Sequence, residues 1–324
     1  MRGRDINAEL WQQHAWRNRL QSFVLLVSMG GFLALLGWLL WGGDGIAALL
    51  TMGVIGVLFN PSISPQLVMR LYGASPVGAN QAPALWTVLS RLAERAELPE
   101  RPELYYVPSR MLNAFAVGAP RHSAIAVTDG LLRQLNLREL TGVLAHEISH
   151  IRSNDLWVMG LADMFRRTTS LLSLVGQFLL VVNLPLVILS AVSINWFAIG
   201  LLVFAPNLSA LAQLALSRTR EYDADLNAVR LTGDPEGLSA ALAKIKRAQG
   251  GWWERIFFPG RRIPEPSLLR THPVTGERIA RLMALKPDVA GADVLPVGAA
   301  VDLGPFAGRP VVRPPRRHFS GLWY

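Results

Sequence analysis

Residues 137–153 read LRELTGVLAHEISHIRS and contain two histidines, His146 and His150, four positions apart. On an α-helix, positions i and i+4 lie on the same face, so both imidazoles can bind one metal ion. Zinc binds neutral imidazole nitrogens, and Glu147 beside them can take a proton from a zinc-bound water. The pattern predicts one Zn²⁺ per chain, with both histidines as metal ligands and Glu147 as the catalytic base.

The residues around the two histidines support a helix. Asn136 is a suitable N-cap, and apolar residues follow it at helical spacing: Leu137, Leu140, Val143, Leu144 and Ile148. The alternative is that two surface histidines have this spacing by chance. Because the chain has only six histidines among 324 residues, we favour the metal site.

Long uncharged segments predict membrane-spanning helices. Leu20–Trp41 has no charged residue in 22 positions, Ile46–Phe59 is a second uncharged run, and Thr168–Ser217 has fifty residues without an ionisable side chain. A helix of about 20 residues crosses the hydrocarbon core of a bilayer. The segments therefore predict four transmembrane helices, arranged as one hairpin at residues 20–60 and a second at 168–217.

The basic residues behind the net charge of +9 have a regular placement relative to the predicted spans. The turns within the two hairpins contain Asp44 and no Lys or Arg, whereas the opposite ends of the spans carry Arg2, Arg4, Arg17, Arg19, Arg70, Arg166, Arg167, Arg218 and Arg220. The positive-inside rule then predicts that both termini and the His146 region are cytoplasmic. Because this arrangement explains the basic excess, we expect a lipid bilayer and no nucleic acid as partner. The absence of cysteine excludes disulfides and thiolate zinc sites.

The predicted spans divide the chain into six segments. They are a cytoplasmic lead at 1–19, the first hairpin at 20–60, the first part of a soluble domain at 61–167, the second hairpin at 168–217, the second part of the soluble domain at 218–285, and a Pro-rich tail at 286–324. We expect the tail to be extended or partly disordered. An aromatic segment at 250–270 is either an interfacial segment or an ordinary packed loop.

Hydrophobic periodicity predicts a mainly α fold with a small β-sheet in the soluble domain. Helices are expected at 84–98, 129–134, 137–153, 217–231, 238–248 and 275–285, and strands at 104–107, 113–117 and 124–127. The last two strands form a predicted hairpin across Gly118-Ala119-Pro120.

A catalytic zinc ion takes three protein ligands and keeps one position open for water. The stretch Ser217–Asp225 places Glu221 and Asp225 one helical turn apart, directly after the last predicted span. Glu221 can bind zinc while Asp225 accepts a hydrogen bond from a ligating imidazole. From spacing alone, a solvated helix end on which Arg218 and Asp225 lie at the surface is an equal alternative.

Two motifs together resemble the HtpX-like branch of membrane zinc metallopeptidases: His146-Glu147-Ile148-Ser149-His150 and Arg220-Glu221-Tyr222-Asp223-Ala224-Asp225. The stretches Asn113-Ala114-Phe115-Ala116 and Thr271-His272-Pro273 are also typical of that family. The resemblance extends over about residues 60–285 and includes the order of the spans.

The resemblance implies specific roles for four residues. His146, His150 and Glu221 would bind zinc in a gluzincin-like ligand set, and Glu147 would be the general base. It also implies a multi-pass protein of the bacterial inner membrane that degrades damaged or misassembled membrane proteins.

Further candidates have two interpretations each. Asp155 either orients a histidine or caps a helix, and His272 either stabilises the oxyanion or is a hydrogen-bonded turn residue. Arg218 is a further candidate near the transition state. The segment Asn113–Ala116 either binds substrate at a sheet edge through backbone hydrogen bonds or is a core strand.

These features predict a zinc-dependent endopeptidase that acts on membrane proteins. Glu147 removes a proton from the metal-activated water and passes it to the leaving amine. The alternatives are a selective processing protease similar to the prenyl-protein protease and an inactive zinc-binding membrane scaffold. Four helices are too few for an enclosing chamber, and a scaffold has no need of Glu147. The sequence names neither the substrate nor the oligomeric state.

Overall fold

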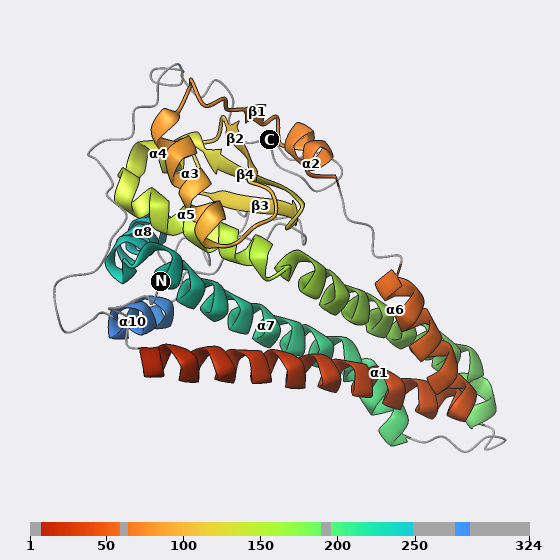
Figure 1. Ribbon diagram of the computed structural model, residues 1–324. Coiled ribbons are helices and arrows are strands. Elements are labelled where there is room, and N and C mark those ends of the chain that lie inside the picture. The colour runs from red at the N-terminus through yellow and green to blue at the C-terminus, as the bar shows by residue number, and fades with distance from the viewer. Residues whose placement is uncertain (1–7, 59–63, 189–195, 249–275, 286–324) are drawn as a thin grey trace. The chain divides into compact units, whose positions relative to one another are not determined.

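The computed structural model describes residues 8–58, 64–188, 196–248 and 276–285. The chain forms two compact units (Figure 1). The mixed unit comprises Met1–Trp16, Ser62–Leu156 and Glu221–Tyr324, and the helical unit comprises Arg17–Pro61 and Trp157–Arg220. The predicted aromatic segment at 250–270 and the Pro-rich tail at 286–324 lie outside the described residues.

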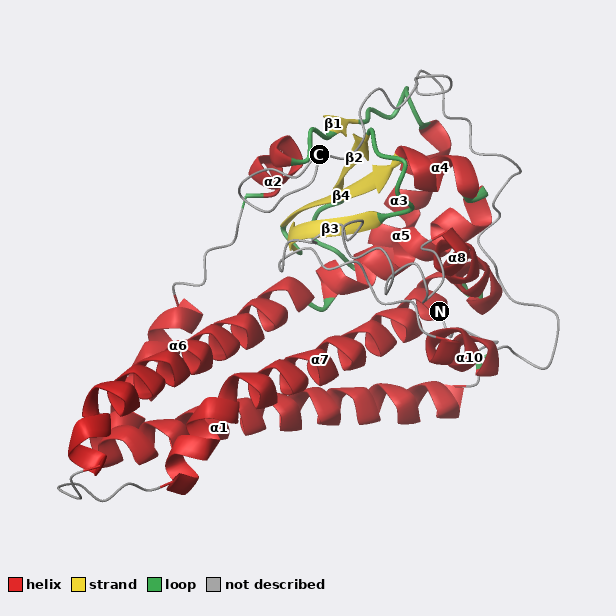
Figure 2. Cartoon of the chain, turned by 180° about the vertical axis from the view of Figure 1, so that it is seen from behind, coloured by secondary structure: helices red, strands yellow, loops and turns green. Residues whose placement is uncertain are grey.

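A β-sheet forms the centre of the mixed unit. In the described chain it has four strands in the order β1 (Ser75–Pro76), β2 (Glu103–Val107), β4 (His122–Thr128) and β3 (Ala114–Ala119). β2 and β4 are parallel, whereas β1 pairs with β2 and β3 pairs with β4 in antiparallel fashion. Among these strands β3 is therefore at an edge of the sheet (Figure 2).

The β3–β4 hairpin is present as predicted, with longer strands and a later turn. Gly118 has a φ of 104°, and a Cβ at this position would lie 2.2 Å from the carbonyl oxygen of His122. Only glycine fits such a backbone position. Pairing continues to Ala119 and His122, so the chain turns at Pro120 and Arg121.

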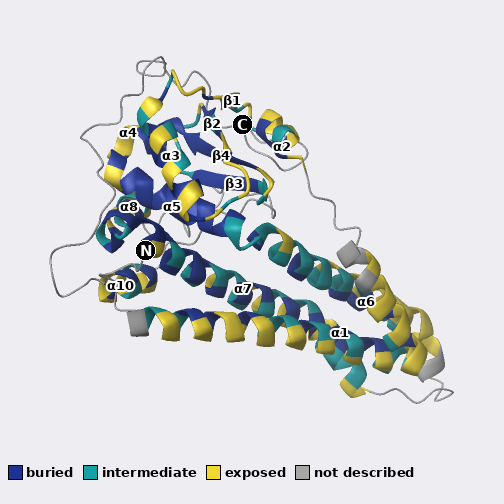
Figure 3. Cartoon of the chain, in the orientation of Figure 1, coloured by how far each residue is buried: buried dark blue, intermediate teal, exposed yellow. Residues whose placement is uncertain are grey.

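Both faces of the sheet are covered. On β2, Leu104 and Tyr106 belong to the larger apolar core and Val107 belongs to a smaller one, as the twofold alternation of strand side chains requires. The helices that contribute to the larger core include α3 (Pro83–Arg95), α5 (Leu137–Arg152) and α8 (Pro235–Ala248). On the other face, α2 (Pro65–Leu71) contributes to the smaller core. Figure 3 shows the resulting burial of β3, β4 and α5.

Helix α5 begins at the predicted cap and packs closely on α8. The Asn136 side chain accepts a hydrogen bond from the backbone N–H of Glu139, and the Glu139 carboxylate accepts one from Asn136 in return. A Cβ on Gly142 would lie 2.9 Å from the backbone nitrogen of Leu238, so the two helices approach as closely as a glycine permits. The face of α5 that carries the two histidines is thus fixed within the core.

The helical unit is formed by parts of α1 (Ala8–Leu58), α6 (Asp155–Ile188) and α7 (Trp196–Thr232). Within the residues that are described, these three helices are long and apolar enough to cross a membrane. Large apolar side chains on them are exposed, including Phe23, Phe178 and Leu211. A lipid environment accounts for this exposure, because hydrocarbon tails solvate apolar side chains.

Helix α1 covers both the first and the second predicted span, and it contains a break between them. Trp41 and Gly42 have non-helical torsions, with a φ of 63° at Gly42. A Cβ on Gly37 would lie 2.7 Å from the carbonyl oxygen of Gly45, although a straight helix would separate the two residues by about 12 Å. The chain therefore turns back at the glycines, and α1 has two arms (Figure 1).

Candidate metal centre

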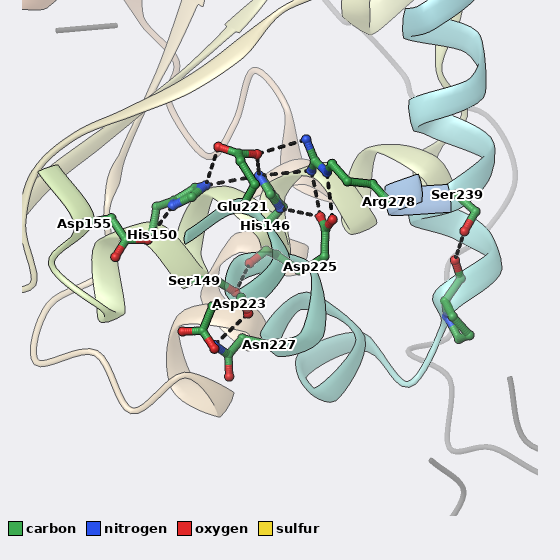
Figure 4. A network of polar contacts seen from close by, with 12 residues as sticks. His146, Ser149, His150, Asp155, Glu221, Asp223, Asp225, Asn227, Ser239 and Arg278 are labelled. Atoms are coloured by element: carbon green, nitrogen blue, oxygen red, sulfur yellow. Dashed lines mark hydrogen bonds and ion pairs between the residues drawn. The ribbon is translucent and has the colours of Figure 1, made fainter. Parts of the chain in front are cut away.

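The two histidines of α5 lie side by side, and a glutamate from α7 meets them (Figure 4). His146 Nε2 and His150 Nε2 are 3.1 Å apart. Glu221 Oε2 is 3.4 Å from His146 Nε2, and Glu221 Oε1 is 3.7 Å from His150 Nε2. All three side chains are buried, and the structure thus brings together the three residues predicted as metal ligands.

The spacing of the donor atoms fits a zinc site. Zinc binds imidazole nitrogen and carboxylate oxygen at about 2.0–2.2 Å, so neighbouring donors around a tetrahedral ion lie about 3.3 Å apart. The separations of 3.1 Å between the two Nε2 atoms and 3.7 Å between His150 Nε2 and Glu221 Oε1 bracket that value. One ligand atom from each of the three residues lies within 4.8 Å of the others. Two imidazoles and one carboxylate are also a ligand set of catalytic zinc centres.

Each histidine has an acid at its second ring nitrogen. His146 Nδ1 is 3.0 Å from Asp225 Oδ1, and His150 Nδ1 is 2.6 Å from Asp155 Oδ2. Such contacts favour a proton on Nδ1 and leave Nε2 to bind a metal. The structure therefore places Asp155 and Asp225, both candidates from the sequence, against the two rings.

His146 lies in a buried and acidic environment. Burial lowers the pKa of His146, but the hydrogen bonds to Asp225 and Glu221 outweigh burial and raise the pKa overall. Because a metal binds the neutral imidazole, protons and metal compete for this residue.

One charged residue of this cluster was not predicted from the sequence. Arg278 of α10 (Gly276–Ala284) contacts two of the acids on α7. Its Nη1 lies 2.9 Å from Glu221 Oε2, and its Nε and Nη2 each lie 2.7 Å from an oxygen of Asp225. Burial lowers the pKa of Arg278, but Asp225, Glu221 and Glu147 raise it well above its usual value, so the guanidinium is charged.

A signal for Arg278 was present in the sequence. In the helix expected at 275–285, Arg278 shares one face with Leu282 and Leu285, and all three are buried in the structure. A charged residue in register with an apolar stripe requires a partner inside the protein.

The other candidates occupy different positions. Glu147 is 2% exposed, and its charge acts on Arg278, so it lies near the cluster. Arg218 is exposed and belongs to the helical unit. His272 lies outside the described residues. Asn113 directly precedes β3, which contains Ala114, Phe115 and Ala116 and contacts α5.

Comparison with known proteins decides the family. The model of Peptidase family M48 matches residues 79–286, a range that contains α5, Glu221 and Arg278. This chain belongs to peptidase family M48. M48 peptidases are in general zinc-dependent, which agrees with the cluster of His146, His150 and Glu221.

Relatives of the M48 chain carry the description "Protease HtpX homolog". The protein of Desulfatibacillum aliphaticivorans is 34% identical over 307 residues, which cover 85% of this chain and 92% of the relative. The protein of Pelotomaculum thermopropionicum is 35% identical, with coverage of 84% and 96%, and that of Acaryochloris marina is 36% identical, with coverage of 82% and 88%. With its long apolar helices, the chain is a membrane metallopeptidase of family M48.

Among solved structures, a crystal structure of Ste24p from S. mikatae matches 85% of this M48 chain and 67% of that chain. The two share 18% sequence identity, and the TM-score is 0.44.

Proposed function

We propose that the chain is an endopeptidase that hydrolyses peptide bonds of membrane proteins with one Zn²⁺ ion held by His146, His150 and Glu221. One observation carries the proposal: ligand atoms from two helices far apart in sequence lie within 4.8 Å of one another. When bound, zinc polarises the substrate carbonyl and lowers the pKa of a water to about 7.

Glu147 is the general base in this proposal. It follows His146 on α5 and is buried beside the cluster. It takes a proton from the attacking water and gives it to the leaving amine. Asp155 and Asp225 hold the two imidazoles in the orientation that presents Nε2.

The edge strand β3 is the proposed substrate-binding strand, over Asn113, Ala114, Phe115 and Ala116. The backbone N–H of Thr128 donates to the carbonyl oxygen of Asn113 at 3.1 Å. The backbone polar groups of Asn113 therefore point toward β4, as in a hydrogen-bonded pair of an antiparallel ladder. Because such pairs alternate, Ala114 and Ala116 direct their backbone N–H and C=O groups away from β4.

A peptide can pair with these groups as a further strand. Backbone pairing selects little by side chain, which suits damaged or misassembled membrane proteins as substrates. This substrate class is the one that the family resemblance implies.

The proposed topology has four spans, because the two arms of α1 are counted separately. Basic residues of the helical unit occur near the start of the first arm, in the early turns of α6 and in the last turns of its α7 segment: Arg17, Arg19, Arg166, Arg167, Arg218 and Arg220. The positive-inside rule favours a cytoplasmic position for these ends. We therefore propose a bacterial inner-membrane protein whose catalytic domain, at 61–167 and 218–285, and both termini are cytoplasmic.

Glu147→Gln tests the proposed function. The wild type and the variant are purified in detergent and compared for zinc content and for cleavage of a membrane protein with an unfolded cytoplasmic segment. We expect one zinc per chain in both proteins. Cleavage by the variant should fall by about 10²–10⁴-fold, the usual contribution of general acid–base catalysis.

Glu94→Gln is the matched control, because Glu94 is exposed on α3 and undergoes the same chemical change. It should retain both zinc and cleavage. Wild-type cleavage by Glu147→Gln would exclude the general-base role, and a wild-type protein that binds no zinc would exclude the metal centre itself.

A further inference from the structure

The guanidinium of Arg278 is buried in the candidate metal centre. The residue is 1% exposed, and a buried charge is stable only when it is paired and hydrogen-bonded. Two parallel hydrogen bonds of 2.7 Å join it to both oxygens of Asp225, and Nη1 lies 2.9 Å from Glu221 Oε2. A bidentate pair of this kind fixes the plane of the carboxylate as well as its position.

Both acids that Arg278 holds also contact His146. Asp225 Oδ1 is 2.7 Å from Arg278 Nη2 and 3.0 Å from His146 Nδ1. Glu221 Oε2 is held by Arg278, and Oε1 of the same carboxylate is directed toward His150. Because Glu221 and Asp225 are one turn apart on α7, a single guanidinium from α10 reaches both.

We infer that Arg278 is a positioning residue of the metal centre. It holds Glu221 in the orientation that offers Oε1 to a metal. It also holds Asp225 against the imidazole of His146, so that Asp225 can orient that ring. The inference rests on the proposed function in one respect, namely that the centre binds zinc.

Simple charge balance is the competing explanation for Arg278. Its Nη2 lies 3.5 Å from His146 Nε2, so its positive charge acts on any cation bound at that nitrogen. If charge alone mattered, removal of the guanidinium would increase zinc affinity, because like charges repel. If orientation dominates, its removal weakens zinc binding by about 10–100-fold, as is usual for residues that hold metal ligands. The sign of the change separates the two explanations.

Two substitutions measure this sign. Arg278→Lys keeps the charge but loses the planar fork of donors, and Arg278→Met removes both. Zinc affinity is measured by competition with a chelator, and the cobalt-substituted proteins are compared by visible absorption, which reports ligand geometry. We expect both variants to bind zinc about 10–100-fold more weakly than the wild type and to have altered cobalt spectra.

Wild-type zinc affinity and an unchanged cobalt spectrum in Arg278→Lys would overturn the inference, as would tighter zinc binding by Arg278→Met. If Arg278→Met fails to fold, Arg278→Lys decides the question alone. A wild-type protein that binds no zinc would instead refute the proposed function, so the two failures are distinguishable.

Arg281→Met is the matched control. Arg281 lies on the same helix, pairs with Glu277 at 2.8 Å and stacks 3.9 Å from the ring centroid of Tyr222 on α7. It therefore contributes to the contact of α10 with α7 without touching the metal centre. We expect its zinc affinity to equal that of the wild type. A loss as large as that of Arg278→Met would mean that helix packing, and not carboxylate positioning, explains the effect.

Discussion

His150 Nδ1 lies 2.6 Å from Asp155 Oδ2, although helix α5 ends between the two residues. Asn154 adopts the left-handed conformation, with a φ of 53°, and Asp155, the first residue of α6, lies against the last turn of α5. Asparagine tolerates this conformation better than most residues. The turn between the helices thereby supplies the acid beside His150.

Asp155→Ser should separate the two interpretations of this acid. Serine can still bond the free N–H groups of the first helical turn, but it provides no carboxylate for His150. We expect zinc affinity, measured by chelator competition, to fall by about 10–100-fold. Unchanged zinc affinity with a lowered melting temperature would show that Asp155 serves the helix start alone.

Glu221→Gln should abolish both metal binding and proteolysis. The amide has no negative charge, and it removes the anion that Arg278 contacts at 2.9 Å. Zinc content after dialysis and cleavage of a membrane substrate are the two measurements. Glu277→Gln is the control, because the Glu277 side chain is more than half exposed. A fully metallated Glu221→Gln protein would show that the third ligand is a different residue.

Ala116→Pro tests substrate binding at β3. The substitution removes a backbone N–H that points away from β4, so the β3–β4 ladder keeps its hydrogen bonds. One lost hydrogen bond is worth roughly 0.5–1.5 kcal/mol, so KM should rise about two- to tenfold while zinc content stays constant. An unchanged KM would remove this strand from the substrate-binding site.

Gly142→Val should destabilise the mixed unit without changing its chemistry. The new side chain would press on the backbone of Leu238, because a Cβ already lies 2.9 Å from it. Overpacking of this kind costs about 1–3 kcal/mol, which thermal unfolding detects. Gly78→Val is the control, since a Cβ there meets only Gln81 Oε1, at 3.8 Å. Equal melting temperatures for Gly142→Val and the wild type would contradict the close packing of α5 and α8.

Local signals predicted the parts of the fold that depend on neighbouring residues. The cap at Asn136 and the apolar stripe after it define α5, and both are present in the structure. His146 and His150 face one way because their spacing matches the helical repeat. The same periodicity relates Glu221 and Asp225, although the sequence could not decide whether they faced solvent or the interior.

Features that depend on distant contacts were missed. Arg278 is 53 positions from Asp225 in sequence, and only the folded chain shows that they pair. Strand β1 has two residues and exists because Ser75 pairs with Tyr106, so it has no periodicity to detect. Helix α2 was also missed: it begins at Pro65, and proline occurs in the first turn of a helix as well as at breaks.

The order of the centre's residues along the chain has a consequence for biosynthesis. Both histidines precede α6, whereas Glu221 lies near the end of α7 and Arg278 follows it. Translation runs from the N-terminus, so both imidazoles are synthesised well before the carboxylate that completes the ligand set. A chain whose synthesis has not reached α7 therefore lacks one of the three predicted metal ligands.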